Sequence, residues 1–91
     1  MPKIGRQVFY EGKVQGVGFR FTVRQIAREY DVSGNVRNLP DGRVSLSLQG
    51  EAGEVDAFLQ GVRDSVLAGH IKKEDIEDSL LQEFRGFQII E

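Results

Sequence analysis

Apolar residues recur along this 91-residue chain with two spacings, and each spacing predicts a different kind of element. Alternation of apolar and polar residues is typical of a strand with one buried face, whereas apolar residues three and four positions apart are typical of a helix. The alternating or short apolar runs predict strands over residues 7–13, 32–39, 44–48, 71–79 and 87–90. Helical spacing predicts two helices, over residues 21–30 and 54–68.

Each predicted helix has one apolar stripe that requires a partner surface. The first stripe consists of Val23, Ile26, Ala27 and Tyr30, and the second of Val55, Phe58, Leu59, Val62 and Val66. Arg24 and Arg28 lie on the other side of the first helix, and we interpret them as a solvated face, which is where charges normally lie. The turn signal Pro40-Asp41-Gly42 joins the second and third predicted strands into a hairpin.

The order of the elements predicts the fold class. Strand, helix, strand, strand, helix, strand is the split βαβ, ferredoxin-like arrangement, here with a short extra strand at the end. Two amphipathic helices need one sheet face to cover, so we predict an α+β two-layer sandwich, an antiparallel sheet with both helices on one face. Residues 1–6 are predicted to be an irregular start, and residues 1–91 a single domain, as expected for this length.

Composition narrows the classes of function. The chain has no cysteine, which excludes disulfides and thiolate metal sites and is compatible with the cytoplasm. No apolar run approaches a membrane span, and no signal peptide is recognisable. The net charge of −2 divides into +4 over residues 1–45 and −6 over residues 46–91. The basic half would attract a small anion, whereas a pI near 5.4 argues against general nucleic-acid binding.

The segment 12–20, Gly-Lys-Val-Gln-Gly-Val-Gly-Phe-Arg, joins the first strand to the first helix. Its three glycines allow positive φ, and successive N–H groups in such a turn can converge on one anion. The start of the following helix adds unpaired N–H groups and the positive end of its dipole. Arg20 adds a planar, permanently charged donor fork that suits phosphate. The glycines alone are also typical of a plain tight turn, but together with the helix start and Arg20 they predict an anion cradle for a phosphoryl group.

The two common nucleotide motifs do not fit this loop. A Walker loop ends in Gly-Lys-Ser/Thr, which is absent, and a dinucleotide fingerprint that begins at Gly16 and Gly18 would need a glycine where the chain has Phe21. No Asp, Glu or His cluster has the spacing of metal ligands, so no metal and no cofactor is expected.

At these residues the chain resembles the acylphosphatase family. That family's signature G-x-V-Q-G-V-x-F-R matches residues 12–20 at every fixed position. A second signature, G-x-V-x-N-x-x-D-G-x-V, is matched by residues 34–44. The resemblance is strong over residues 8–48 and looser from the second helix onward. Two departures are Asn35, where the family often has an aromatic residue, and the segment 68–79, which differs from the family's usual Gly-Pro and Ala-x-Val pattern.

The resemblance implies a hydrolase that cleaves acyl phosphates to carboxylate and inorganic phosphate without a metal. It assigns phosphate binding to the loop Gln15, Gly16, Val17, Gly18, Phe19 and Arg20. It also gives Arg20 and Asn38 the catalytic roles, with Asn38 orienting the attacking water. We expect Arg20 and Asn38 to lie close together, because the loop follows the first strand, Asn38 ends the second strand, and we place these two strands next to each other in the centre of the sheet. The expected partners are an acyl phosphate and inorganic phosphate, with no nucleic acid and no membrane, for a cytoplasmic monomer.

Two alternatives belong to other classes of function. RNA-recognition domains share this fold, but their aromatic platform lies on the third strand, and residues 44–48 have no aromatic side chain. The other alternative is a non-catalytic module that binds phosphate, an acyl phosphate or carbamoyl phosphate within a larger carbamoyl-transfer protein. Because the sequence ends at Glu91, we expect the free-standing hydrolase rather than this module.

Overall fold

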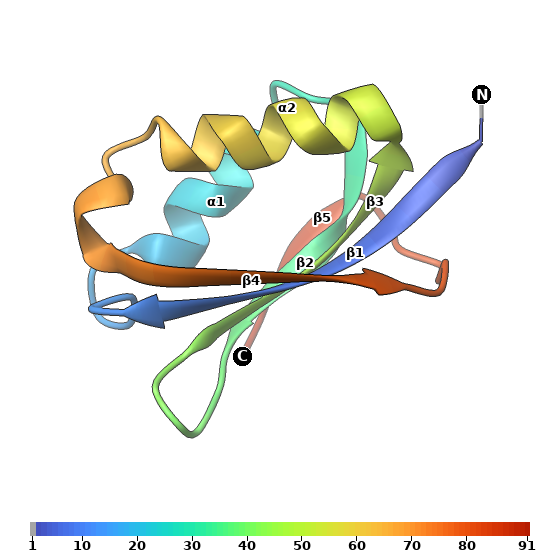
Figure 1. Ribbon diagram of the computed structural model, residues 1–91. Coiled ribbons are helices and arrows are strands. Elements are labelled where there is room, and N and C mark those ends of the chain that lie inside the picture. Colours follow the sequence, from blue (N-terminus) through green and yellow to red (C-terminus); the bar gives the residue numbers. More distant parts are fainter. Residues whose placement is uncertain (1) are drawn as a thin grey trace.

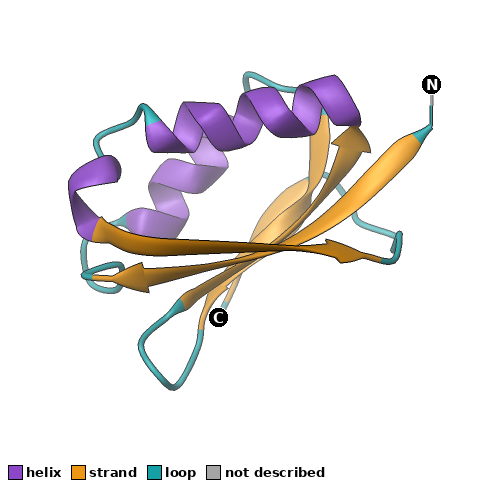
Figure 2. Cartoon of the chain, viewed as in Figure 1, coloured by secondary structure: helices purple, strands orange, loops and turns teal. Residues whose placement is uncertain are grey.

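The computed structural model describes residues 2–91, and its elements form two layers (Figure 1). In chain order they are β1 (Lys3–Gly12), α1 (Phe19–Ala27), β2 (Val32–Asn38), β3 (Val44–Glu51), α2 (Ala52–Arg63), the 3₁₀ helix η1 (Ala68–His70), β4 (Ile71–Ser79) and β5 (Phe87–Ile90). Both α-helices lie on one face of the sheet (Figure 2). The predicted ferredoxin-like α+β class is confirmed.

The five strands form one sheet in the order β4-β1-β3-β2-β5. The three pairs β4–β1, β1–β3 and β3–β2 are antiparallel, but β5 runs parallel to β2, with Gly34 opposite Phe87. The prediction of a wholly antiparallel sheet is therefore wrong for the last strand. Residues 80–86 carry the chain from one edge of the sheet to the other, and β5 then runs in the direction of β2. The prediction that β1 and β2 are adjacent is also wrong, because β3 lies between them.

The core lies between the helices and the inward side of the sheet. Val8, Tyr10, Val36, Val44, Leu46 and Leu48 supply the sheet's side of this core. Both predicted stripes pack against it, with one exception: Val66 is 80% exposed because α2 ends at Arg63 rather than at residue 68. The described helices are too short and too polar to cross a membrane.

Several helices and strands begin or end at other residues than the sequence predicts. β1 begins at Lys3, because residues 3–6 pair with β3 and residues 5–6 also pair with β4, so the predicted irregular start is wrong for residues 3–6. Helix α1 spans Phe19–Ala27 instead of residues 21–30. Strand β3 continues to Glu51 and α2 begins at the next residue, which removes the loop predicted there. The bounds of β4 and β5 agree with the prediction.

Gly34 permits the close approach of β2 to β3. Its φ is 155°, and a Cβ at this position would lie 1.8 Å from the carbonyl oxygen of Ser47, which belongs to the facing backbone. Because that oxygen cannot move without disturbing the ladder, we expect Gly34→Ala to lower the free energy of unfolding by at least about 2 kcal/mol. Urea denaturation followed by circular dichroism measures this change.

The matched control is Gly53→Ala in the first turn of α2. A Cβ there meets no atom within 4 Å, so the substitution should leave stability unchanged or raise it by up to about 1 kcal/mol. Equal stability losses in the two variants would contradict the assigned role of Gly34.

Tyr10 is a buried titratable residue of the core. Burial, and then the charge of Glu74 on the adjacent strand β4, raise the pKa of Tyr10 above its usual value of about 10. Above pH 10 the unfolded chain releases this proton while the folded chain retains it, so the free energy of unfolding falls as pH rises. We expect Tyr10→Phe to flatten this fall in urea titrations between pH 9 and 11. An unchanged slope in the variant would count against the burial of a neutral Tyr10.

Candidate active site

The loop between β1 and α1 has the backbone conformation of an anion nest. Gly16 and Gly18 have φ of 78° and 74°, and Val17 between them has a negative φ. Alternation of this kind directs successive N–H groups toward one side of the chain. A Cβ at either glycine would meet no atom within 4 Å, so positive φ rather than crowding requires glycine here.

The start of helix α1 completes this nest. Its N-cap is Gly18, which provides no side-chain hydrogen bond, and its first turn contains no acidic residue. The N–H of Thr22 donates to the carbonyl oxygen of Gly18 at 3.0 Å, which leaves the N–H groups of the preceding turn for a ligand. Free N–H groups and the positive end of the helix dipole together favour an anion at this position.

Gln15 fixes the loop against the β2–β3 hairpin. Its Nε2 donates to the carbonyl oxygens of Leu39 and Arg43, both at 2.9 Å. The two carbonyls flank the turn that follows Asn38. This contact reaches across β3 and brings the loop to the end of β2, although the two strands are not neighbours in the sheet.

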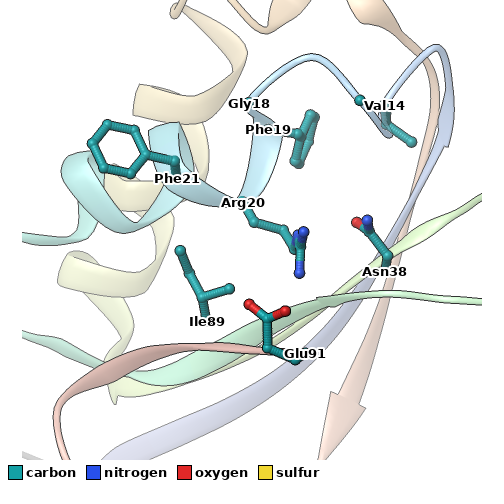
Figure 3. Close-up of a pocket in the computed structure, with 9 residues that line it drawn as sticks. Val14, Gly18, Phe19, Arg20, Phe21, Asn38, Ile89 and Glu91 are labelled. Carbon is teal, nitrogen blue, oxygen red and sulfur yellow. The ribbon is translucent and has the colours of Figure 1, made fainter.

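A cavity of about 220 Å³ lies where the loop, α1, β2 and β5 meet (Figure 3). Its lining consists of Val14, Gly16, Gly18, Phe19, Arg20, Phe21, Asn38, Ile89 and Glu91. The guanidinium of Arg20 extends toward Asn38, and Glu91 lines the same pocket (Figure 3). The two residues expected to act together, Arg20 and Asn38, thus line one pocket.

Both of these side chains have unused hydrogen-bonding capacity. Arg20 Nη1 donates to the carbonyl oxygen of Ile90 at a long 3.4 Å, and within residues 2–91 Arg20 forms no ion pair. The Oδ1 atom of Asn38 is buried and has no hydrogen-bond partner within the same residues. Buried polar atoms are normally satisfied, so an unpartnered oxygen in a pocket indicates a place for a ligand or a water molecule.

The other predicted loop residues divide into two groups. Gly16, Gly18 and Phe19 line the pocket, whereas Gln15 and Val17 do not. The ring of Phe19 is buried 5.2 Å from that of Tyr10, so only its backbone is available to a ligand. The role of Gln15 in this structure is to hold the loop.

Sequence reasoning does not assign Phe21, Ile89 and Glu91 to the site, and it places Val14 in the cradle segment 12–20 but not among the phosphate-binding residues. Phe21 is 54% exposed and forms part of the rim, so it differs from the buried Phe19. Ile89 and Glu91 enter through the parallel pairing of β5 with β2, for which the sequence carries no local signal. The part of the chain that the structure describes has no group of three His, Cys, Asp or Glu residues suited to a metal ion.

The sequence and the structure of this chain were compared with those of known proteins. The Acylphosphatase family model matches residues 6–89. A protein of Acaryochloris marina named acylphosphatase is 42% identical over 79 residues, which is 87% of this chain and 85% of that protein. The crystal structure of acylphosphatase from Bacillus subtilis superimposes with a TM-score of 0.87 at 27% identity. The match covers 97% of this chain and 99% of the Bacillus subtilis chain. The crystal structure of full-length HypF in its phosphate- and nucleotide-bound form also superimposes with a TM-score of 0.87, at 26% identity. This match covers 99% of this chain but 12% of the HypF chain. This chain belongs to the acylphosphatase family.

Proposed function

We propose that this chain hydrolyses the carboxyl–phosphate bond of acyl phosphates, with Arg20 and Asn38 as its two catalytic side chains. The observation that carries the proposal is that Asn38, whose buried Oδ1 has no hydrogen-bond partner among residues 2–91, lines the same pocket as Arg20, whose guanidinium makes one long hydrogen bond. One group is suited to hold an anion and the other to hold a water molecule. The membership of the chain in the acylphosphatase family supports this assignment.

The phosphoryl group would bind in the nest. The N–H groups from Gly16 to the first turn of α1 donate to its oxygens, and the guanidinium of Arg20 completes the shell. The backbone donors are fixed before the substrate arrives, because Gln15 holds the loop and Gly18 starts the helix. Fixed donors stabilise the charge that the phosphoryl oxygens carry in the transition state, which is the main requirement of phosphoryl transfer.

Asn38 would position the attacking water. Its Oδ1 accepts a hydrogen bond from the water, whose oxygen forms a bond to phosphorus while the bond from phosphorus to the acyl oxygen breaks. The electron pair of that bond leaves with the carboxylate. An asparagine cannot take up the water's proton, so the proton passes to a phosphoryl oxygen or to solvent, and the products are a carboxylate and inorganic phosphate.

This reaction places modest demands on the protein. The leaving group is a carboxylate, which needs no protonation, and the donors described here neutralise the phosphoryl oxygens. The proposal therefore includes no metal and no cofactor. The acyl phosphate and its phosphate product are the proposed partners, and nucleic acid and membranes are not part of the proposal.

We further propose that residues 1–91 act as one acylphosphatase-like domain, as a monomer and in the cytoplasm. The absence of cysteine supports the compartment. The charged outer face of β4, with Lys73, Asp75 and Glu77, supports the monomeric state, because charges on an edge strand oppose pairing with a second sheet.

A binding module is the second candidate function, and the similarity to HypF favours it. There the matching region is a small part of a longer protein. In that case this chain would hold phosphate, an acyl phosphate or carbamoyl phosphate in the same cradle without hydrolysing it. The experiment below distinguishes the two functions.

Substitution of the two catalytic residues should abolish most of the turnover without unfolding the protein. With benzoyl phosphate as substrate, Arg20→Lys loses the paired donors and should lower kcat/KM on the order of 10³-fold or more. Asn38→Ala loses the oriented water and should lower kcat on the order of 10²-fold. Turnover is measured with and without a chelator, and each variant is checked by a thermal melt.

Matched controls exist on the opposite face of the sheet. Arg37→Lys and Asn35→Ala alter the same residue types on β2, outside the pocket, and should retain wild-type turnover. Equal losses in the controls, or turnover that disappears with the chelator, would contradict the assigned roles. Wild-type protein that is protected by phosphate against melting but has no turnover would be a binding module.

Glu91 is the one acidic side chain among those that line the pocket. Its charge opposes the binding of an anion, so we expect Glu91→Gln to lower the Kd for inorganic phosphate by about two- to fivefold, and less at high salt. Isothermal titration measures this affinity. Glu83→Gln removes the same charge from the exposed segment 80–86 and should leave the Kd unchanged. Weaker phosphate binding by Glu91→Gln would show that the carboxylate instead holds Arg20 in place.

A further inference from the structure

Helix α1 carries a row of arginines that begins in the catalytic pocket. Arg20, Arg24 and Arg28 are four residues apart, so they follow one another along one side of the helix, about 6 Å apart along its axis. Residues 13–28 contain these three arginines and Lys13 but no acidic residue. The row therefore creates a positive potential that extends well beyond the phosphoryl site.

A second cavity adjoins this row. It has a volume of about 310 Å³ and is lined by Arg24, Ala27, Arg28, Val32 and Phe87. Phe87 and Ile89 face the same side of β5, and Ile89 lines the catalytic pocket. Both cavities thus lie between α1 and the edge strand β5.

Arg24 differs from the solvated residue that the sequence predicts. It is half-buried, its Nε is buried without a hydrogen-bond partner among residues 2–91, and within those residues it forms no ion pair. Its guanidinium lies 5.9 Å from the centre of the exposed ring of Phe21. Buried donors of charged groups are normally paired, so the unsatisfied guanidinium of this half-buried arginine, beside the second cavity, is suited to bind an anion from outside the chain.

We propose that Arg24 and Arg28 form a second anion subsite, which binds a carboxylate or phosphate carried on the acyl part of the substrate. This inference rests on the proposed function, because the first anion is the phosphoryl group at Arg20. The spacing of the arginines places the second anion about 6–12 Å further along the helix. Phe21 and Ile89 provide apolar surface for the chain that links the two anions. The preferred substrates are therefore acyl phosphates with a second negative charge.

A purely structural role of Arg24 makes a different prediction. If Arg24 served only to pack on Phe21, its loss would impair every substrate in the same proportion. A subsite instead affects substrates according to their charge. The two roles are separated by the ratio of kcat/KM for a charged and an uncharged substrate of equal length.

The test uses hexanoyl phosphate and adipoyl monophosphate, which have six-carbon acyl groups that end in a methyl or a carboxylate. A third substrate of the same length ends in a phosphonate and distinguishes the two kinds of anion. We expect the wild type to favour at least one charged substrate over hexanoyl phosphate on the order of tenfold, through KM and less so at high salt. Arg24→Gln should reduce this ratio to near one, and Arg28→Gln should reduce it partly.

Arg37→Gln is the matched control, since it removes the same charge from the other face of the sheet and should preserve the ratio. If Arg24→Gln does not fold, Arg28→Gln carries the test, because Arg28 is exposed. Hydrolysis of all three substrates without preference, or equal changes in Arg37→Gln, would overturn the subsite and leave the proposed function intact. Absence of turnover with every substrate would overturn the proposed function and the subsite with it.

Discussion

The two hydrogen bonds from Gln15 to the carbonyl oxygens of Leu39 and Arg43 hold the site together. The sheet alone would keep the glycine loop and Asn38 apart, since β3 separates the strands that carry them. Gln15 spans this gap and connects the loop to the hairpin turn. Each bond is individually modest, on the order of 1 kcal/mol, but they fix the relative position of groups that must meet one ligand. The proposed phosphate cradle and the proposed water site therefore depend on a side chain that does not line the pocket.

The same region contains several polar groups that lack the partners usual in a folded protein. A helix usually begins with a capping side chain and acidic residues, whereas α1 begins with an uncapped Gly18 and no acid in its first turn. Asn38 and Arg24 likewise have buried polar atoms without hydrogen-bond partners among residues 2–91, as do Tyr10 and Glu74 elsewhere in the structure. Gly18, Asn38 and Arg24 line two cavities beside α1. Their common location is the best reason to regard them as sites for anions and water.

The sequence alone predicted most of this architecture, and its failures have physical causes. Periodicity located β4 and β5 to the residue, and the glycine loop was recognised from its own composition. The start of α1 was placed two residues late, because Gly18 caps it by its positive φ and not by a side chain. Residues 3–6 were missed as strand, because backbone pairing holds them and not an apolar pattern. Long-range pairing of β5 with β2 has no local signal, so Ile89 and Glu91 were absent from the predicted site.

Strand β5 has four residues, lies at the edge of the sheet and has one neighbouring strand. Short edge segments of this kind exchange their amide hydrogens by local opening, at a free energy well below that of global unfolding. Such fraying would remove Ile89 and the carbonyl of Ile90 from around Arg20 while the core of β1, β3 and the helices stayed intact. The integrity of the binding pocket and the integrity of the fold are consequently two separate quantities in this protein, and a melting temperature measured without a ligand reports only the second.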